Sequence, residues 1–154
     1  MKKTILQYIQ IQRILLIFLL LLLPFGAHAQ IDSITRNWTM VSRKTNENQA
    51  LIRIFRAADG LYYGKIEKMY KHVDAHCDKC EGKDKGKPLL GMMIIRGMKA
   101  ENGILKEGYV LDPLSGKKYY GTISYDTKTE KLKLRGSLDK RGVLGMCLYW
   151  IKSN

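Results

Sequence analysis

Two cysteines and two histidines lie close together in one polar segment of the chain, and these residue types are the best suited to chemistry. Cys77 and Cys80 form a Cys-x-x-Cys pair, and His72 and His76 precede it within the segment 71–88. Thiolates and imidazoles are the usual ligands of zinc, and paired thiols form disulfides or carry out thiol–disulfide exchange. The segment therefore predicts a local disulfide, a metal site or a redox site.

The surroundings of the cysteine pair favour the disulfide over the other two. In an exported protein, oxidising conditions favour a bond that closes this long loop on itself. A metal site would fold all four side chains around one ion within nine residues, whereas zinc sites usually join two separated pairs. A redox motif works at a helix N-terminus inside an α/β domain, and no βαβ pattern surrounds this one. The third thiol, Cys147, lies in an apolar terminal stretch and is expected to behave as a small buried hydrophobe.

Other catalytic motifs are not found in the sequence. It contains no Gly-x-Ser-x-Gly, no phosphate-binding glycine loop and no His-Glu-x-x-His. After residue 29 the histidines are confined to the loop, so a Ser-His-Asp arrangement would need a base from a mobile segment. The sequence therefore predicts a protein that is not an enzyme and needs no cofactor.

The elements that must position these residues are short β-prone runs separated by turn signals such as Asp59-Gly60 and Asn102-Gly103. The predicted strands are 38–43, 50–57, 61–70, 89–98, 104–111, 117–125, 131–138 and 145–152. Neighbouring runs are expected to pair as antiparallel hairpins, because the turns between them are short. This pattern is typical of an all-β barrel or sandwich.

Side-chain alternation along these runs predicts which faces are buried. In 131–135, period two places two leucines on one face and the cations Lys131, Lys133 and Arg135 on the other, which predicts a basic outer face. The runs 51–55 and 92–95 are apolar on both faces, so either both faces are covered by other parts of the protein or one face lines an interior cavity. The run 92–98 is also compatible with a short helix that plugs one end.

Aromatic residues supply the candidates for ligand contact. The pattern Tyr-Tyr-Gly-x-Ile occurs twice, beginning at Tyr62 and at Tyr119, each time after a glycine turn. Paired tyrosines can hold a ligand by ring faces and hydroxyls, although a strand bend with aromatic cover explains the same pattern. The candidate ligand-binding residues are Tyr63, Tyr120, Trp38 and Trp150.

The order of motifs resembles a known bacterial family. The motifs are Arg36-Asn37-Trp38, the run 59–66, Cys77-Asp78-Lys79-Cys80, the runs 87–91, 111–119 and 132–136, and Trp150. Together they resemble domain of unknown function 2147 (DUF2147) from about Arg36 to Lys152. The resemblance implies a small exported protein without an established function, built as a lipocalin-like, single antiparallel up-and-down barrel of about eight strands.

The N-terminus has the pattern of a signal peptide. Basic residues precede the apolar run 14–25, which is broken by Pro24, and Ala27-His28-Ala29 fits a cleavage site. The uninterrupted run is shorter than the ~20 residues that a membrane-spanning helix needs. Residues 1–29 are therefore predicted to be removed, leaving a single domain of residues 30–154 in the periplasm or outside the cell.

The charge balance is strongly basic. The full chain has a net charge of +13, and removal of residues 1–29, which hold three cations and no acids, leaves +10. Such a field attracts polyanions, and for an exported protein these are anionic envelope components rather than nucleic acid, for which no binding motif is found.

Three functions remain open at the level of sequence. The first is a barrel that binds a small apolar or amphipathic ligand or an envelope component. The second is an interaction protein whose basic face docks on an anionic envelope surface. The third is a redox or metal-handling protein that uses the cysteine loop. The oligomeric state is not predicted.

Overall fold

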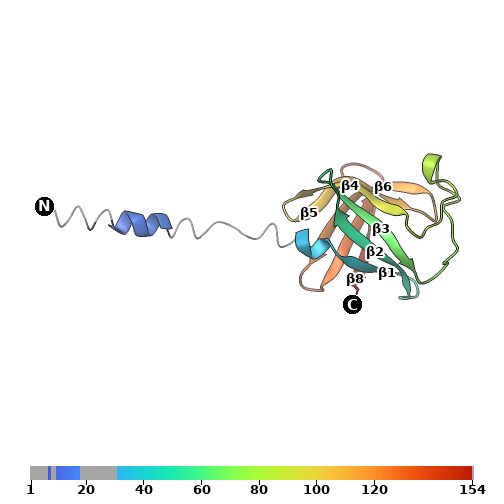
Figure 1. The fold of residues 1–154 in the computed structure, drawn as a ribbon, viewed down its shortest axis with the longest axis horizontal. Helices are drawn as coiled ribbons and strands as arrows, with labels where there is room; N and C mark the ends of the chain where they lie inside the picture. The colour runs from blue at the N-terminus through green and yellow to red at the C-terminus, as the bar shows by residue number, and fades with distance from the viewer. Residues whose placement is uncertain (1–6, 8–9, 18–30, 154) are drawn as a thin grey trace.

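The structure, a computed structural model, is a closed antiparallel barrel of eight strands (Figure 1). It describes residues 7, 10–17 and 31–153. The strands are β1 Asn37–Val41, β2 Asn48–Arg56, β3 Tyr62–Met69, β4 Met93–Glu101, β5 Ile104–Asp112, β6 Lys117–Asp126, β7 Lys131–Ser137 and β8 Gly145–Lys152. Each strand pairs with the next, and β8 returns to β1, so the predicted all-β up-and-down barrel is confirmed.

Strand boundaries agree with the prediction except at β4. The fourth strand was expected from Leu89, but the residues before Met93 form a turn, in which the Met92 amide donates to the Leu89 carbonyl at 3.1 Å. Gly91 adopts a φ of +82° in this turn, a conformation that glycine enters without strain. The alternative of a helix over 92–98 is wrong, because this run pairs with β3 and β5 as a strand.

One end of the barrel is filled by a short helical turn over residues 31–34, and we call it the closed end. Ile34 and Trp38 are fully buried there, and the Trp38 indole donates a hydrogen bond to the Ile34 carbonyl at 2.9 Å. The Trp38 ring also packs against Tyr125, with 6.0 Å between the ring centroids. Figure 1 shows this turn at the opposite end of the barrel from the long segment between β3 and β4.

The middle of the barrel is packed, and glycines in the strands make room for larger side chains. A Cβ on Gly64 would lie 2.6 Å from the Ile95 side chain, and a Cβ on Gly108 would lie 2.5 Å from Met98. Ile95 and Met98 are both fully buried. The interior is therefore filled at this level, as expected of an eight-stranded barrel.

The barrel closes through a short seam between β1 and β8. The paired residues there are Trp38 with Lys152 and Thr39 with Ile151, both near the closed end. The first half of β8 pairs with β7 alone, from Ser137 opposite Gly145 onward. Toward the other end, which we call the open end, β1 and β8 therefore diverge and leave space between them.

The predicted signal peptide falls largely outside the described residues. Of residues 1–29, the structure describes residues 7 and 10–17, which are helical and exposed. Among the described helices, none has the length and apolar character needed to cross a membrane.

Candidate functional site: a cavity at the open end of the barrel

A cavity of about 450 Å³ occupies the open end of the barrel. Every strand contributes to its walls, together with the segment between β3 and β4 and the turn between β5 and β6. The apolar lining consists of Met40, Ile66, Met69, Leu89, Ile94, Val110, Leu111, Pro113, Leu114, Leu134, Met146, Leu148 and Trp150. The arrangement is an apolar chamber above a packed barrel waist.

Trp150 lines the cavity and carries a hydrogen-bond donor that has no partner among the described residues. Its side chain is 2 % exposed, and its indole Nε1 is buried without a hydrogen-bond partner among the described residues. A buried N–H without an acceptor costs free energy that a bound acceptor would recover. Of the two predicted tryptophans, Trp150 therefore lines the cavity, whereas Trp38 belongs to the closed end.

Polar side chains form the edge of the cavity, and cations outnumber acids there. Arg43, Lys71, His72 and Gln49 lie at this edge with a single carboxylate, Asp112. The Asp112 carboxylate is used within its own turn, since it accepts hydrogen bonds from the Leu114 amide at 3.1 Å and the Ser115 hydroxyl at 2.6 Å. Because Lys71 also lies 3.3 Å from Glu47, the edge favours a ligand with an anionic polar end mainly through Arg43.

The two predicted tyrosines lie on the outside of the barrel. The Tyr63 hydroxyl donates to Asp59 at 2.7 Å, and the Tyr120 side chain is 43 % exposed. Their predecessors point inward instead: Tyr62 is buried at the closed end, and Tyr119 lines the cavity. The orientation of Tyr119 could have been predicted from the two-residue alternation of a strand, because Tyr119 shares a face with the inward residues Gly121 and Ile123 of β6.

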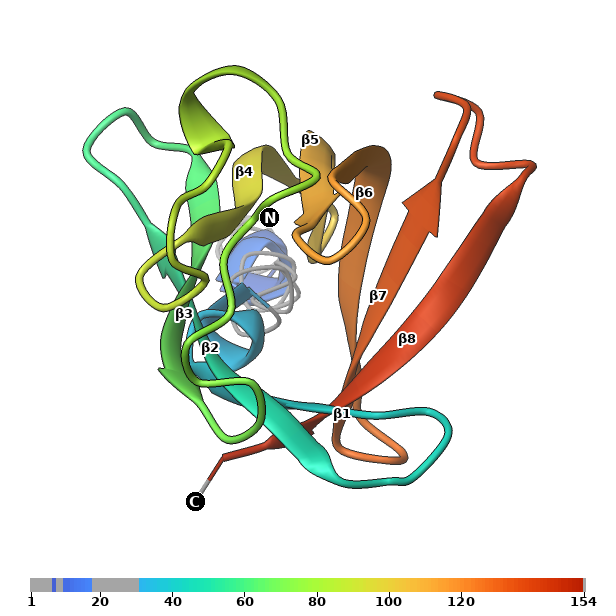
Figure 2. The ribbon, with the colours of Figure 1, turned by 90° about the vertical axis from the view of Figure 1, so that its right-hand side faces the viewer.

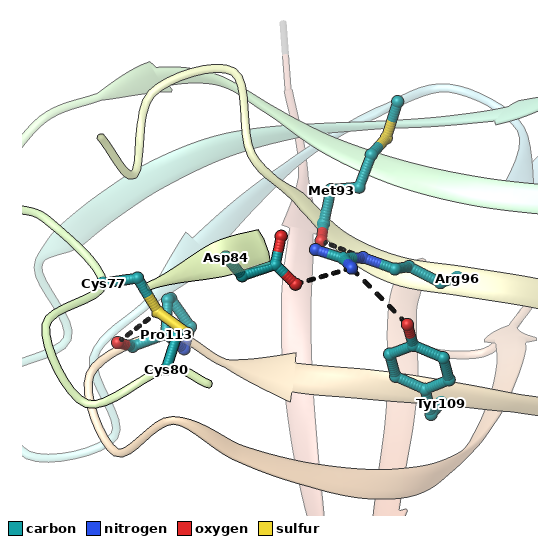
Figure 3. Close-up of polar contacts among 7 residues, drawn as sticks. All are labelled: Cys77, Cys80, Asp84, Met93, Arg96, Tyr109 and Pro113. Carbon is teal, nitrogen blue, oxygen red and sulfur yellow. Dashed lines mark hydrogen bonds and ion pairs between the residues drawn. A yellow bond between two sulfur atoms is a disulfide. The ribbon is translucent and has the colours of Figure 1, made fainter. Parts of the chain in front are cut away.

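The predicted disulfide between Cys77 and Cys80 is confirmed, with 5.3 Å between the Cα atoms (Figure 3). Both residues are buried, and Cys77 Sγ lies 3.1 Å from the Pro113 carbonyl oxygen. A disulfide leaves no thiolate to bind a metal, and the described residues contain no group of three or more histidines, cysteines and acids placed to hold one.

The other residues that were candidates for chemistry lie apart from one another. His72 lies at the cavity edge and His76 forms a backbone bridge with Pro88. Cys147 is free and only partly buried.

An ion pair anchors the same segment to the barrel wall. Asp84, in the 3₁₀ turn η1 (Gly82–Asp84), lies 2.7 Å from the Arg96 guanidinium, and both side chains are largely buried. Arg96 also donates to the Met93 carbonyl at 2.7 Å and to the Tyr109 hydroxyl at 3.5 Å (Figure 3). The hydrogen bond from Arg96 lowers the pKa of the Asp84 carboxyl below its ordinary value, against the opposing effect of burial.

Replacing Asp84 by asparagine is expected to lower the free energy of unfolding by about 2 kcal/mol at neutral pH, since the partly buried Arg96 loses its negatively charged partner and keeps only a neutral amide oxygen as acceptor. Because the folded-state pKa is depressed, the contribution is complete above the unfolded pKa of about 3.9 and is lost as the pH falls through the folded pKa. Urea unfolding of both proteins between neutral and acidic pH measures the difference.

The exposed pair Lys99–Glu107, 2.9 Å apart, offers a matched control for this ion pair. Its side chains are 64 % and 53 % exposed, so Glu107→Gln should change stability far less than Asp84→Asn. Equal losses in the two variants, or a difference for Asp84→Asn that persists unchanged in acid, would contradict the anchoring role of Asp84.

The three cations of the predicted basic face lie on the outward-facing side of β7 but differ in exposure. Lys131 and Lys133 are exposed on the outside of β7, as alternation predicts. Arg135 is partly buried instead, because its guanidinium donates to the carbonyl oxygens of Gly142 and Val143 in the β7–β8 connection. Lys131 and Lys133 are therefore the more exposed cations of this face.

A second hollow, of about 600 Å³, lies at the closed end between the helical turn and the β4–β5 turn. Its walls carry Arg36, Arg53 and Arg56 together with Asp32 and Glu101. Three cations and two acids line it with few aliphatic side chains, so it lacks the apolar chamber found at the open end.

The fold and the cavity define a small up-and-down barrel with a packed middle and an apolar cavity at its open end. The chain belongs to the family described as uncharacterized protein conserved in bacteria (DUF2147), whose model matches residues 37–152. A search of curated proteins finds no match.

Among solved structures, the chain is similar to one described as protein HP1028 from the human pathogen Helicobacter pylori, which belongs to the lipocalin family. The TM-score is 0.66 at 15 % sequence identity, over 78 % of this chain and 82 % of that one. At this identity the likeness establishes the lipocalin-like fold.

Proposed function

We propose that the protein is a binding protein, not an enzyme, that holds one amphipathic small molecule in the open-end cavity. The observation that carries the proposal is the apolar chamber of about 450 Å³, built by all eight strands. Its volume lies within the range of about 300–1,000 Å³ found for small-molecule sites. Eight-stranded barrels of the lipocalin type are wide enough to hold one small ligand.

The polarity of the walls supports a ligand with an apolar chain and an anionic head. The deep residues Ile66, Leu134 and Trp150 are nearly inaccessible to solvent and would contact the chain. Arg43 and Lys71 at the edge would face the head, and the Trp150 indole would donate to an acceptor inside. A single-chain carboxylate or phosphate amphiphile satisfies all three features.

The other two hypotheses receive less support. A redox role needs an accessible sulfur, but Cys77 is 0 % and Cys80 is 3 % exposed. Docking through Lys131, Lys133 and Arg135 is less favoured because the Arg135 guanidinium already donates hydrogen bonds to carbonyl oxygens of the β7–β8 connection. We also propose export with removal of residues 1–29, which rests on the N-terminal sequence pattern.

Protein purified from the envelope of its native host tests both proposals together. Its intact mass should correspond to a chain that begins at Gln30, and organic extraction should release an amphiphile. Adding that amphiphile back at about 100 times its Kd should raise the free energy of unfolding by about 2.7 kcal/mol, visible as a higher Tm.

A protein that is recovered empty, and whose Tm does not respond to a panel of fatty acids and lysophospholipids, would reject the carrier function. A product that retains residues 15–23 would reject cleavage without touching the ligand proposal. The two outcomes are therefore separable.

A further inference from the structure

Exposed aliphatic side chains gather at the open end of the barrel. In an up-and-down barrel, the β1–β2, β3–β4, β5–β6 and β7–β8 connections lie at one end, here the open end. The apolar rim comprises Val73, Leu90, Leu114, Leu138, Val143, Leu144 and Met146, all between 53 % and 74 % exposed. Within the described barrel, the connections at the closed end, 57–61, 102–103 and 127–130, hold no exposed large hydrophobic residue.

Four of the seven rim residues lie in or next to the β7–β8 connection, which is held in a fixed shape. The Asp139 carboxylate accepts hydrogen bonds from the amides of Val143 at 2.8 Å and Leu144 at 3.2 Å. The Leu138 amide donates to the Leu144 carbonyl at 2.9 Å, and Arg135 donates to carbonyls of the same turn. These polar contacts use the backbone and leave the apolar side chains in solvent: Val143 is 74 % and Leu144 67 % exposed.

Cations accompany the apolar side chains of the β7–β8 connection, whereas the long segment between β3 and β4 carries the exposed acids Asp74, Asp78 and Glu81 beside its lysines. Lys140 and Arg141 are exposed within the β7–β8 connection. Asp139 caps its own turn, and at the same end of the barrel Glu47 lies 3.3 Å from Lys71. An apolar tip flanked by positive charge matches a surface that is apolar inside and anionic outside, which describes an anionic bilayer.

We infer that the open end of the barrel docks on an anionic lipid bilayer, with the β7–β8 connection inserted among the headgroups. The contact uses the outer surface, so it does not depend on an occupied cavity. Leu114 and Met146 belong both to the rim and to the cavity wall, so the docked barrel turns its cavity mouth toward the lipid. A second copy of the chain is the less favoured occupant, because the same cations would face each other.

Figure 2 views the barrel from the side of the long segment between β3 and β4. In this view the segment passes in front of the barrel, and the connected strands β7 and β8 stand apart from it at the right, beyond β5 and β6. Val73 and Leu90 of the rim belong to the long segment, and Leu138 to Met146 belong to the connection and the start of β8. Two separate parts of the chain therefore supply the rim, which gives the barrel a broad base for docking.

Sedimentation with vesicles tests the inference. The full mature chain should bind vesicles of phosphatidylcholine mixed with phosphatidylglycerol, bind pure phosphatidylcholine weakly, and lose affinity as salt is raised. Leu144→Asp should reduce binding to the mixed vesicles by about tenfold, because it removes an inserted side chain and adds repulsion. Thr127→Asp makes the same charge change at the closed end and should bind as the unmodified protein does.

A second pair of variants separates oriented docking from net charge. Lys140→Glu with Arg141→Glu should weaken binding strongly, whereas Lys128→Glu with Lys131→Glu, an equal charge change at the other end, should weaken it little. Unchanged melting temperatures confirm that each variant folds.

Equal losses in the two double variants, or full binding by Leu144→Asp, would overturn the inference. The inference would also be overturned if the unmodified protein does not bind the mixed vesicles but self-associates in analytical ultracentrifugation, and if Leu144→Asp abolishes that self-association. That result would assign the rim to contacts between copies of the chain.

Discussion

Replacing Leu148 by tryptophan is expected to weaken ligand binding about 100-fold while the barrel stays folded. Leu148 is partly buried on β8 and lines the cavity beside Trp150, so the larger indole would take the space of the ligand's apolar chain. Loss of apolar contacts between the ligand and the cavity wall that contribute about 3 kcal/mol corresponds to about a 100-fold loss of affinity. Displacement of a fluorescent fatty-acid probe, followed at several protein concentrations, measures the loss.

The neighbouring residue supplies the control. Tyr149 is 45 % exposed and points outward, so Tyr149→Trp adds an indole to the same strand without entering the cavity. Trp150→Phe replaces the indole by a smaller phenyl ring that lacks the unpartnered N–H, and the lost hydrogen bond should cost up to about tenfold in affinity if the ligand accepts it. Probe affinity that is equal in Leu148→Trp and Tyr149→Trp would place the ligand outside this cavity.

Local patterns in the sequence predict most of this fold. Alternation along 131–135 places Leu132 and Leu134 inside the barrel, as the structure confirms, because period two leaves a half-buried strand one choice of face. The start of β4 was missed because a turn around Gly91 precedes it within an unbroken apolar run. The helical turn over 31–34 was missed because four residues are too short to show a helical period.

The candidate site is less accessible to sequence reasoning because its parts meet only in three dimensions. The disulfide was predictable, since its cysteines are three residues apart and the bond is local. The cavity depends on how far β1 and β8 pair, which alternation within single strands does not specify. The same reasoning identified the tyrosine pairs but not their orientation, so Tyr120 was selected where Tyr119 lines the cavity.

The long segment between β3 and β4 supplies part of the cavity edge, and its placement depends on one glycine in another turn. Gly116 has a φ of +73°, and a Cβ there would collide with the backbone carbonyl of Lys79, next to the disulfide. Gly116→Ala is expected to lower the free energy of unfolding by about 3 kcal/mol, from left-handed backbone strain and displacement of the segment. Hydrogen exchange should rise in residues 71–92, and ligand affinity should fall, because Lys71, His72 and Leu89 line the cavity.

Gly86→Ala separates these two causes. Gly86 has nearly the same φ, +70°, but a Cβ there would meet no atom within 4 Å. It should therefore show the backbone strain alone, about 1 kcal/mol, with exchange in the segment and ligand affinity close to those of the unmodified protein. If both alanine variants lose the same stability and keep the same affinity, the contact with Lys79 does not position the segment. If only Gly116→Ala opens the segment and weakens binding, the turn between β5 and β6 sets the shape of the cavity mouth.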